Sequence, residues 1–98
     1  MQVIAKRTLR EFWSHHPRAE GPLRVWFGIT QKAVWTCPAD IKRDFGIKVD
    51  FVSDNRAIFD IGGNKYRLIV RMAYLHKRIM IKFVGTHEEY DKINSETV

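Results

Sequence analysis

The sequence predicts an α+β domain in which two long helices cover one face of an antiparallel sheet. Apolar residues recur at helical spacing in the first third of the chain and alternate with polar ones after residue 56, as in strands. The triplet "GGN" at residues 62–64 indicates a hairpin turn between two of those strands. The 98 residues suffice for one core, so we expect a single domain spanning residues 1–98.

The N-terminal third contains a short strand and two helices. Residues 2–6 are predicted to form the strand, and Thr8 with Glu11 has the spacing of a capping box that opens the first helix. Pro17 ends that helix, and a second one runs from residue 18 or 22 to residue 34. Its apolar face comprises Leu23, Trp26, Phe27, Thr30, Ala33 and Val34.

Residues 36–55 are the least informative part of the sequence. Pro38 with Asp40, and Asp54 with Asn55, indicate turns. The stretch "ADIKRDF" predicts one helical turn. A flexible loop over a site and an additional helix are both open interpretations of this region.

The last part of the chain has the pattern of a three-stranded meander, with strands at residues 56–61, 65–75 and 79–85. Thr86 and Glu89 repeat the capping-box spacing and predict a short final helix. In the third strand, alternation places Ile79, Ile81 and Phe83 on one face, and Met80, Lys82 and Val84 on the other.

Charge and composition restrict the expected partners and compartment. A formal net charge of +6 favours a polyanion: nucleic acid, an acidic protein or an anionic membrane surface. Cys37 is the only cysteine, so an internal disulfide is impossible and a reducing compartment fits. No apolar run approaches the length of a membrane span, and the N-terminus lacks a signal-peptide pattern. We therefore expect a cytoplasmic protein.

A row of cations marks the second strand of the meander. Lys65, Arg67 and Arg71 share one face, and Lys82 joins them if the register of the next strand permits. The helices need the opposite, apolar face, so the cations should point outward. Residues 61–87 contain six Lys or Arg and no Asp or Glu, whereas solvated faces usually mix signs because like charges repel. An anion site is favoured over an ordinary solvated face, and both interpretations remain open.

Such a face could support RNA cleavage, because RNA carries its own nucleophile in the 2′-OH. Arg67 and Arg71 could stabilise charge on the phosphorane, and His87 could act as acid or base. Tyr90 lies three residues after His87 and shares its helical face. A purely structural role for the histidine is the alternative. The sequence has no metal-ligand spacing and no glycine-rich phosphate loop, so neither a metal nor another cofactor is predicted.

The motifs "FDIGGNKYRLIV" and "FVGTHEEYDKI" resemble the C-terminal half of the HigB-type toxins of the RelE-like superfamily. The N-terminal half fits this resemblance in order and character. It implies the small RelE-like fold, with two helices on a curved antiparallel sheet, and a type II toxin that acts as a metal-independent endoribonuclease on mRNA. It also implies a cognate antitoxin that binds DNA, and mRNA cleavage in the ribosomal A site, since many relatives act on translating ribosomes.

The resemblance also assigns residues. Arg67 matches the arginine of the "YRL" strand motif, His87 the basic position after the last strand, and Tyr90 the aromatic of the closing segment. These three are the expected catalytic residues. RelE has arginine near the place of His87, and here Glu88 and Glu89 follow at once. A basic module that binds RNA or protein without cutting is therefore the alternative function. The residues expected to contact RNA are Lys65, Arg71 and Lys82.

Overall fold

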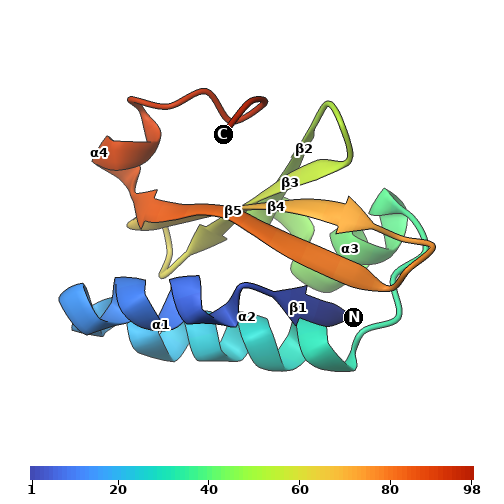
Figure 1. Cartoon of the computed structure of the whole chain (residues 1–98), viewed down its shortest axis with the longest axis horizontal. Coiled ribbons are helices and arrows are strands. Elements are labelled where there is room, and N and C mark those ends of the chain that lie inside the picture. The colour runs from blue at the N-terminus through green and yellow to red at the C-terminus, as the bar shows by residue number, and fades with distance from the viewer.

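A computed structural model describes all 98 residues as a five-stranded sheet with helices on both sides (Figure 1). The elements, in chain order, are β1 (Gln2–Ile4), α1 (Lys6–His15), a 3-10 turn (Pro17–Ala19), α2 (Glu20–Lys32), α3 (Pro38–Phe45), a second 3-10 turn (Gly46–Lys48), β2 (Val49–Val52), β3 (Arg56–Ile61), β4 (Tyr66–Ala73), β5 (Arg78–Thr86) and α4 (His87–Tyr90).

The sheet has the order β1-β5-β4-β3-β2. Strands β2 to β5 pair antiparallel, whereas β1 pairs parallel with β5 and forms one edge. The twisted sheet carries α1 and α2 on one face, and α4 with the C-terminal segment on the other (Figure 1). The predicted α+β architecture is confirmed, with a parallel edge strand added. No helix combines the length and apolar character needed to cross a bilayer.

Helix α1 begins earlier than the sequence predicted. Ala5 precedes it in a left-handed conformation, with φ of 74°, and no side chain caps the helix. Thr8 already lies in the first turn, where its backbone N–H donates to the Ala5 carbonyl oxygen at 2.9 Å. The predicted capping box at Thr8 is therefore wrong, because β1 enters the helix through a single residue. The predicted break at Pro17 is confirmed.

Helix α2 buries Leu23, Trp26 and Thr30 against the sheet, as its apolar spacing predicted. It ends at Lys32, so Val34 lies outside the helix and is 66% exposed. The amino group of Met1 caps the C-terminal end of α2 by donating to the carbonyl oxygens of Thr30, Gln31 and Ala33. Including Val34 in the helical face was thus an error.

Residues 36–55 contain more regular structure than the turn signals indicated. Helix α3 is eight residues long and begins with Pro38 in its first turn, a position that needs no N–H donor. Asp40 accepts hydrogen bonds from the backbone N–H and hydroxyl of Thr36, both at 2.8 Å. Strand β2 then pairs with β3 at the second edge of the sheet. The sequence did not predict this strand.

The main core lies between the helices and the sheet. Trp26 packs edge-on against Phe59, which in turn contacts Phe45. The sequence favours a core built around Trp13, Trp26, Phe27, Tyr66, Leu68 and Val70, but Trp13 and Phe27 are only partly buried against the main core. The buried members are Met1, Leu9, Ala19, Leu23, Trp26, Trp35, Ile41, Val49, Ala57, Phe59, Ile61, Tyr66, Leu68, Val70, Met72 and Ile79.

A β-bulge in β5 reverses the predicted faces of its last residues. Ile69 pairs with Phe83 but Val70 pairs with Ile81, so Lys82 is the extra residue. Val84 consequently packs with the helix-side core, whereas Phe83 pairs with Ile69, which is not part of that core. The alternation predicted through Phe83 and Val84 is wrong because the bulge shifts the period by one residue.

The outer face of the sheet is partly covered. Ile58 and Ile69 pair across β3 and β4, are buried, and lie outside the helix-side core. The C-terminal segment crosses above this side of the sheet (Figure 1). Arg56 holds the segment by donating from Nη1 to the carbonyl oxygens of Ser95 and Val98, at 3.4 and 2.6 Å. The outer face is thus a second, smaller layer of packing.

Candidate functional site

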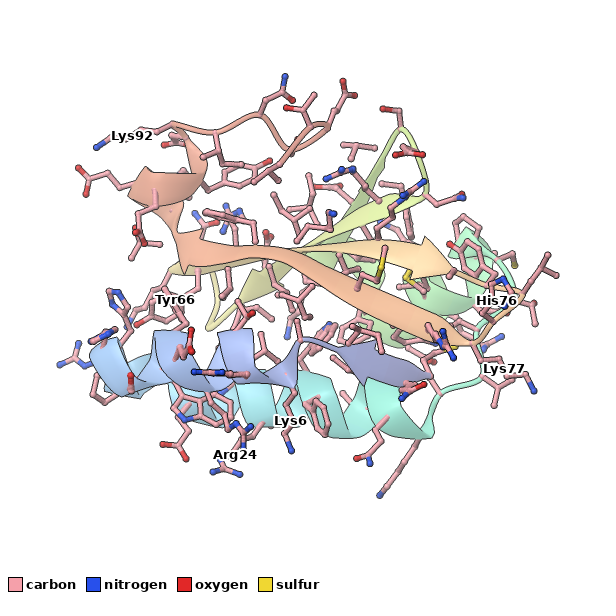
Figure 2. All side chains as sticks on the ribbon, in the orientation of Figure 1. Lys6, Arg24, Tyr66, His76, Lys77 and Lys92 are labelled. Atoms are coloured by element: carbon pink, nitrogen blue, oxygen red, sulfur yellow. The ribbon has the colours of Figure 1, made fainter.

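Four of the predicted site residues gather at one end of the sheet, where the β3–β4 turn meets the end of β5 and α4. The backbone N–H of His87 donates to the Lys65 carbonyl oxygen at 3.0 Å, which ties α4 to the β3–β4 turn, where Lys65 lies instead of on the predicted strand. The Cζ atom of Arg67 lies 5.7 Å from the centre of the Tyr90 ring. The rings of His87 and Tyr90 meet edge-on at 6.5 Å. In Figure 2, Tyr66 of β4 marks this end of the molecule.

Arg67 is held firmly in this group and is only 9% exposed. Its Nε pairs with an Asp60 carboxylate oxygen at 3.2 Å. Its Nη1 donates to the carbonyl oxygens of Asn64 and Tyr66, and its Nη2 donates to the Asn64 side-chain oxygen. A guanidinium has five N–H donors, so these contacts leave one Nη2 hydrogen for a ligand.

Asp60 and Asn64 are site residues that the sequence analysis missed. Asp60 faces Arg67 directly across the β3–β4 hairpin, and Asn64 lies in the turn between those strands. The turn between the strands comprises four residues, 62–65, so Ile61 pairs with Tyr66 and Asp60 with Arg67. The three-residue turn "GGN" expected from the sequence would have paired Asp60 with Tyr66, so the sequence alone provided no signal for this contact. Because Asp60 and Asn64 both contact it, the Arg67 side chain is fixed in orientation before any substrate binds.

Helix α4 is positioned by the capping box that the sequence predicted. The Thr86 hydroxyl accepts from the Glu89 N–H, and the Glu89 carboxylate accepts from the Thr86 N–H. Glu89 is therefore engaged at the helix start. His87 pairs through Nδ1 with an Asp91 carboxylate oxygen at 3.1 Å, and its side chain is 46% exposed.

Glycine 85 allows α4 and the end of β5 to pack this closely. A Cβ atom at this position would lie 2.5 Å from the Phe83 ring and 3.3 Å from the Glu89 Cβ. Gly85 is also the direct neighbour of Arg67 across the β4–β5 pair. The absence of a side chain at residue 85 leaves room for the Phe83 ring and for α4 beside the site.

Arg71 and Lys82 do not join this group. Arg71 lies four residues from Arg67 along β4, about 13 Å at 3.3 Å per residue, and pairs with Asp54 at 3.0 Å. Lys82 is the exposed extra residue of the β5 bulge. The two ion pairs also correct the expectation of an uncompensated cationic face. The carboxylates come from β3 and the β2–β3 turn, upstream of the segment whose charges were counted.

The assembled groups can bind an oxyanion and move protons. A fixed guanidinium, a half-exposed imidazole and a phenol converge from β4 and α4, and the Lys65 side chain is exposed beside them. No three His, Cys, Asp or Glu side chains are grouped so as to hold a metal ion. A guanidinium, an imidazole and a phenol are groups that can stabilise charge and transfer protons at a phosphate ester.

Fold and site together define a small α+β protein with a cationic, proton-transferring site at the end of its sheet. The profile of the HigB toxins, described as the RelE-like toxic component of a toxin–antitoxin system, matches residues 19–93. This chain belongs to that family, as the sequence motifs predicted. Toxin–antitoxin systems pair each toxin with an antitoxin, so an antitoxin partner follows from membership.

Two relatives align over nearly the whole chain. One, named mRNA interferase HigB, from Escherichia coli O6:H1 (strain CFT073), is 26% identical over 94 residues, which cover 95% of this chain and 91% of the relative. Another, named mRNA interferase toxin HigB, from Escherichia coli K12, is 25% identical over 92 residues, which cover 93% and 88% of the two chains.

Proposed function

We propose that this chain is the toxin of a type II toxin–antitoxin system and acts as an mRNA interferase, a metal-independent endoribonuclease. The observation that carries this proposal is the convergence of Arg67, His87 and Tyr90 at the end of the sheet. The centre of the Tyr90 ring lies 5.7 Å from the Arg67 Cζ atom and 6.5 Å from the centre of the His87 ring. Family membership and the names of the relatives support the same activity. The proposed unit is a single domain over residues 1–98 that acts in the cytoplasm, where mRNA is found.

The proposed reaction begins at the 2′-OH of the RNA. With Nδ1 of His87 donating to Asp91, Nε2 is free to accept the 2′-OH proton, and the 2′ oxygen attacks the adjacent phosphorus. The remaining Nη2 hydrogen of Arg67 stabilises the charge that develops on the phosphorane oxygens. The bond to the 5′ oxygen then breaks, leaving a 2′,3′-cyclic phosphate and, once protonated, a 5′-OH end.

Tyr90 is the proposed donor of the proton to the 5′ oxygen, and exchange of the acid and base roles between Tyr90 and His87 is the alternative. Its ring lies over the Arg67 guanidinium, which stabilises the phenolate formed when the proton leaves. Lys65, exposed beside the site, is proposed to bind a neighbouring RNA phosphate. Arg71 and Lys82 lie farther along the sheet and are proposed as distal contacts to the RNA backbone.

We further propose that cleavage takes place on mRNA in the ribosomal A site and that the antitoxin is a DNA-binding protein. The support is the resemblance of the "YRL" and "FVGTHEEYDKI" motifs to RelE-like toxins, many of which act on translating ribosomes. The net charge of +6 suits both an RNA-rich target and an acidic protein partner. Ribosome dependence is tested by cleavage of the same transcript with and without ribosomes.

The test is controlled induction in a bacterial host, with growth recorded and primer extension performed on an abundant mRNA. Wild type should arrest growth and create new mRNA ends. His87→Ala should abolish both, because it removes the proposed proton acceptor. The fold should persist, since the side chain is 46% exposed and interacts through an ion pair with Asp91 and a ring contact with Tyr90. Arg67→Ala should also abolish them, but it removes one ion pair and three hydrogen bonds and is the less selective variant.

The matched control is His76→Ala, in the exposed β4–β5 turn at the opposite end of the sheet (Figure 2). It should remain as toxic as wild type. Equal toxicity of wild type and His87→Ala would refute the site. Harmless expression of folded wild type would instead favour the alternative of a non-catalytic RNA- or protein-binding module.

A further inference from the structure

A shallow hollow lies at the C-terminal end of α1, away from the proposed catalytic group. It is lined by His15, His16, Pro17, Arg18 and Tyr66 and has a volume of about 300 Å³. Ligand pockets range from roughly 300 to 1,000 Å³, so the hollow suits a small flat group. No residue of the proposed catalytic chemistry lines it.

An aromatic cluster forms the inner wall of this hollow. The imidazole of His16 stacks on the Phe12 ring at 4.4 Å and meets the Tyr66 ring edge-on at 6.2 Å. Phe12 and Tyr66 also contact each other, at 5.6 Å and nearly perpendicular. The half-buried His16 ring is therefore held in place by two neighbours. A ring fixed in this way offers a stacking surface at little cost in side-chain entropy.

The hollow and the proposed catalytic group occupy the two faces of the same sheet end. Tyr66 lies between Lys65 and Arg67, and successive side chains of a strand point to opposite faces. Tyr66 also pairs with Thr86, the residue that caps α4. A flexible single strand that passes around this end therefore meets Arg67 on one face and His16 on the other.

Charge distinguishes this hollow from its neighbour on the other side of the β3–β4 turn. Its lining includes Arg18 and two histidines but no carboxylate. The neighbouring hollow, of about 380 Å³ between α2, α3 and the turn, is lined by two carboxylates, Asp44 and Asp60, and one cation, Lys48. The lining of the hollow at the end of α1 is therefore the more positive of the two and the more favourable to a polyanion.

We propose that the hollow at the end of α1 is a nucleobase subsite for the RNA next to the cleaved phosphate. The base stacks on the His16 ring, and Arg18 contacts the backbone phosphate. This subsite rests on the proposed ribonuclease function and extends it, because it places substrate selection on α1, outside the catalytic group. The test must distinguish a nucleobase bound in this hollow from a protein partner bound there.

The test measures RNA binding separately from cleavage. A fluorescently labelled 2′-O-methyl RNA lacks the nucleophilic hydroxyl, so its dissociation constant is obtained by anisotropy without turnover. His16→Ala should weaken binding by about 5- to 150-fold, the range that corresponds to loss of one stacked base. His16→Phe keeps a flat ring and should bind close to wild type. His76→Ala, at the opposite end of the sheet, should bind as wild type.

The cleavage pattern provides the second measurement. With His87 and Arg67 intact, His16→Ala should still cut mRNA but at an altered set of positions in primer extension. Wild-type affinity of His16→Ala, with thermal unfolding showing a folded protein, would overturn the subsite while leaving the nuclease in place. Unchanged RNA affinity combined with lost protection by the co-expressed antitoxin would assign the hollow to the protein partner and equally overturn it. A wild type that neither binds nor cleaves RNA would refute the proposed function itself.

Discussion

The two faces of β4 show two different ways of stabilising one strand. On the helix side, Leu68 and Val70 are fully buried among apolar neighbours. On the outer side, Arg67 and Arg71 are each paired with one carboxylate, from Asp60 and Asp54 respectively. Apolar packing stabilises through area and tolerates changes of chemistry, whereas a buried ion pair depends on both partners. The proposed reactive groups therefore lie on the outer face of the sheet, where side-chain geometry depends on specific ion pairs.

The largest expected effect lies on the helix side. Phe59→Ala should lower the free energy of unfolding by about 3–5 kcal/mol, because it leaves a cavity between Trp26 and Phe45. Urea unfolding followed by tryptophan fluorescence measures this loss. A change below about 1 kcal/mol would mean that the helix side is not the main source of stability.

The next effect lies on the outer side and compares two ion pairs. Asp60→Asn should cost about 1–3 kcal/mol, since it leaves the 11% exposed Arg67 side chain without its counter-charge. Asp54→Asn is the matched control and should cost less than about 1 kcal/mol, because the Arg71 side chain is 42% exposed. Asp60→Asn should also reduce toxicity by releasing Arg67. Equal costs for the two variants in urea unfolding would contradict the distinction between them.

A smaller effect concerns the helix that carries His87 and Tyr90. Thr86→Ala removes the hydroxyl half of the capping box and should cost about 1 kcal/mol. Amide hydrogen exchange should accelerate in residues 87–91, and growth arrest should weaken while Arg67 stays in place. Thr86→Ser keeps the hydroxyl and serves as the control. Exchange rates in this segment that match wild type would show that the cap does not order α4.

The smallest effect involves a carboxylate on the α3 side of the molecule. Hydrogen bonds from Thr36 hold the pKa of Asp40 below its ordinary value of 3.8. Because the folded-state pKa is depressed, this group stabilises the fold above pH 3.8, and the contribution is lost as pH falls through the folded-state value. Asp40→Asn should therefore flatten the acid side of the profile of melting temperature against pH. An unchanged acid limb would show that Asp40 makes no such contribution.

Local patterns allowed most of the fold to be predicted. Strands β3 to β5, the two long helices and the capping box of α4 follow from periodicity and turn residues, which depend on neighbours in sequence. Strand β2 was missed because "VDFV" has only four residues and gains its hydrogen bonds from β3. The bulge at Lys82 was missed because an extra residue becomes visible only once two strands are paired.

The candidate site, like the fold, could be predicted from the sequence only where it depends on residues close together in the chain. Tyr90 was expected near His87 from helical spacing, and their rings do meet. The Asp60–Arg67 pair and the coverage of Ile58 and Ile69 were not predicted, since both need the register or the path of the C-terminal segment. The roles of Arg67, His87 and Tyr90 in catalysis remain predictions that the toxicity assays test.

The parallel pairing of β1 with β5 has a consequence for synthesis of the protein. Residues 2–4 are synthesised long before residues 78–80, their partners in the sheet, and cannot pair until those have emerged from the ribosome. The groups proposed to cut RNA, namely Arg67, His87 and Tyr90, likewise follow most of the fold in sequence. Long-range pairing of this kind forms late in folding. The proposed site therefore cannot assemble until residues up to Tyr90 have left the ribosome, so a chain still being translated through this region lacks it.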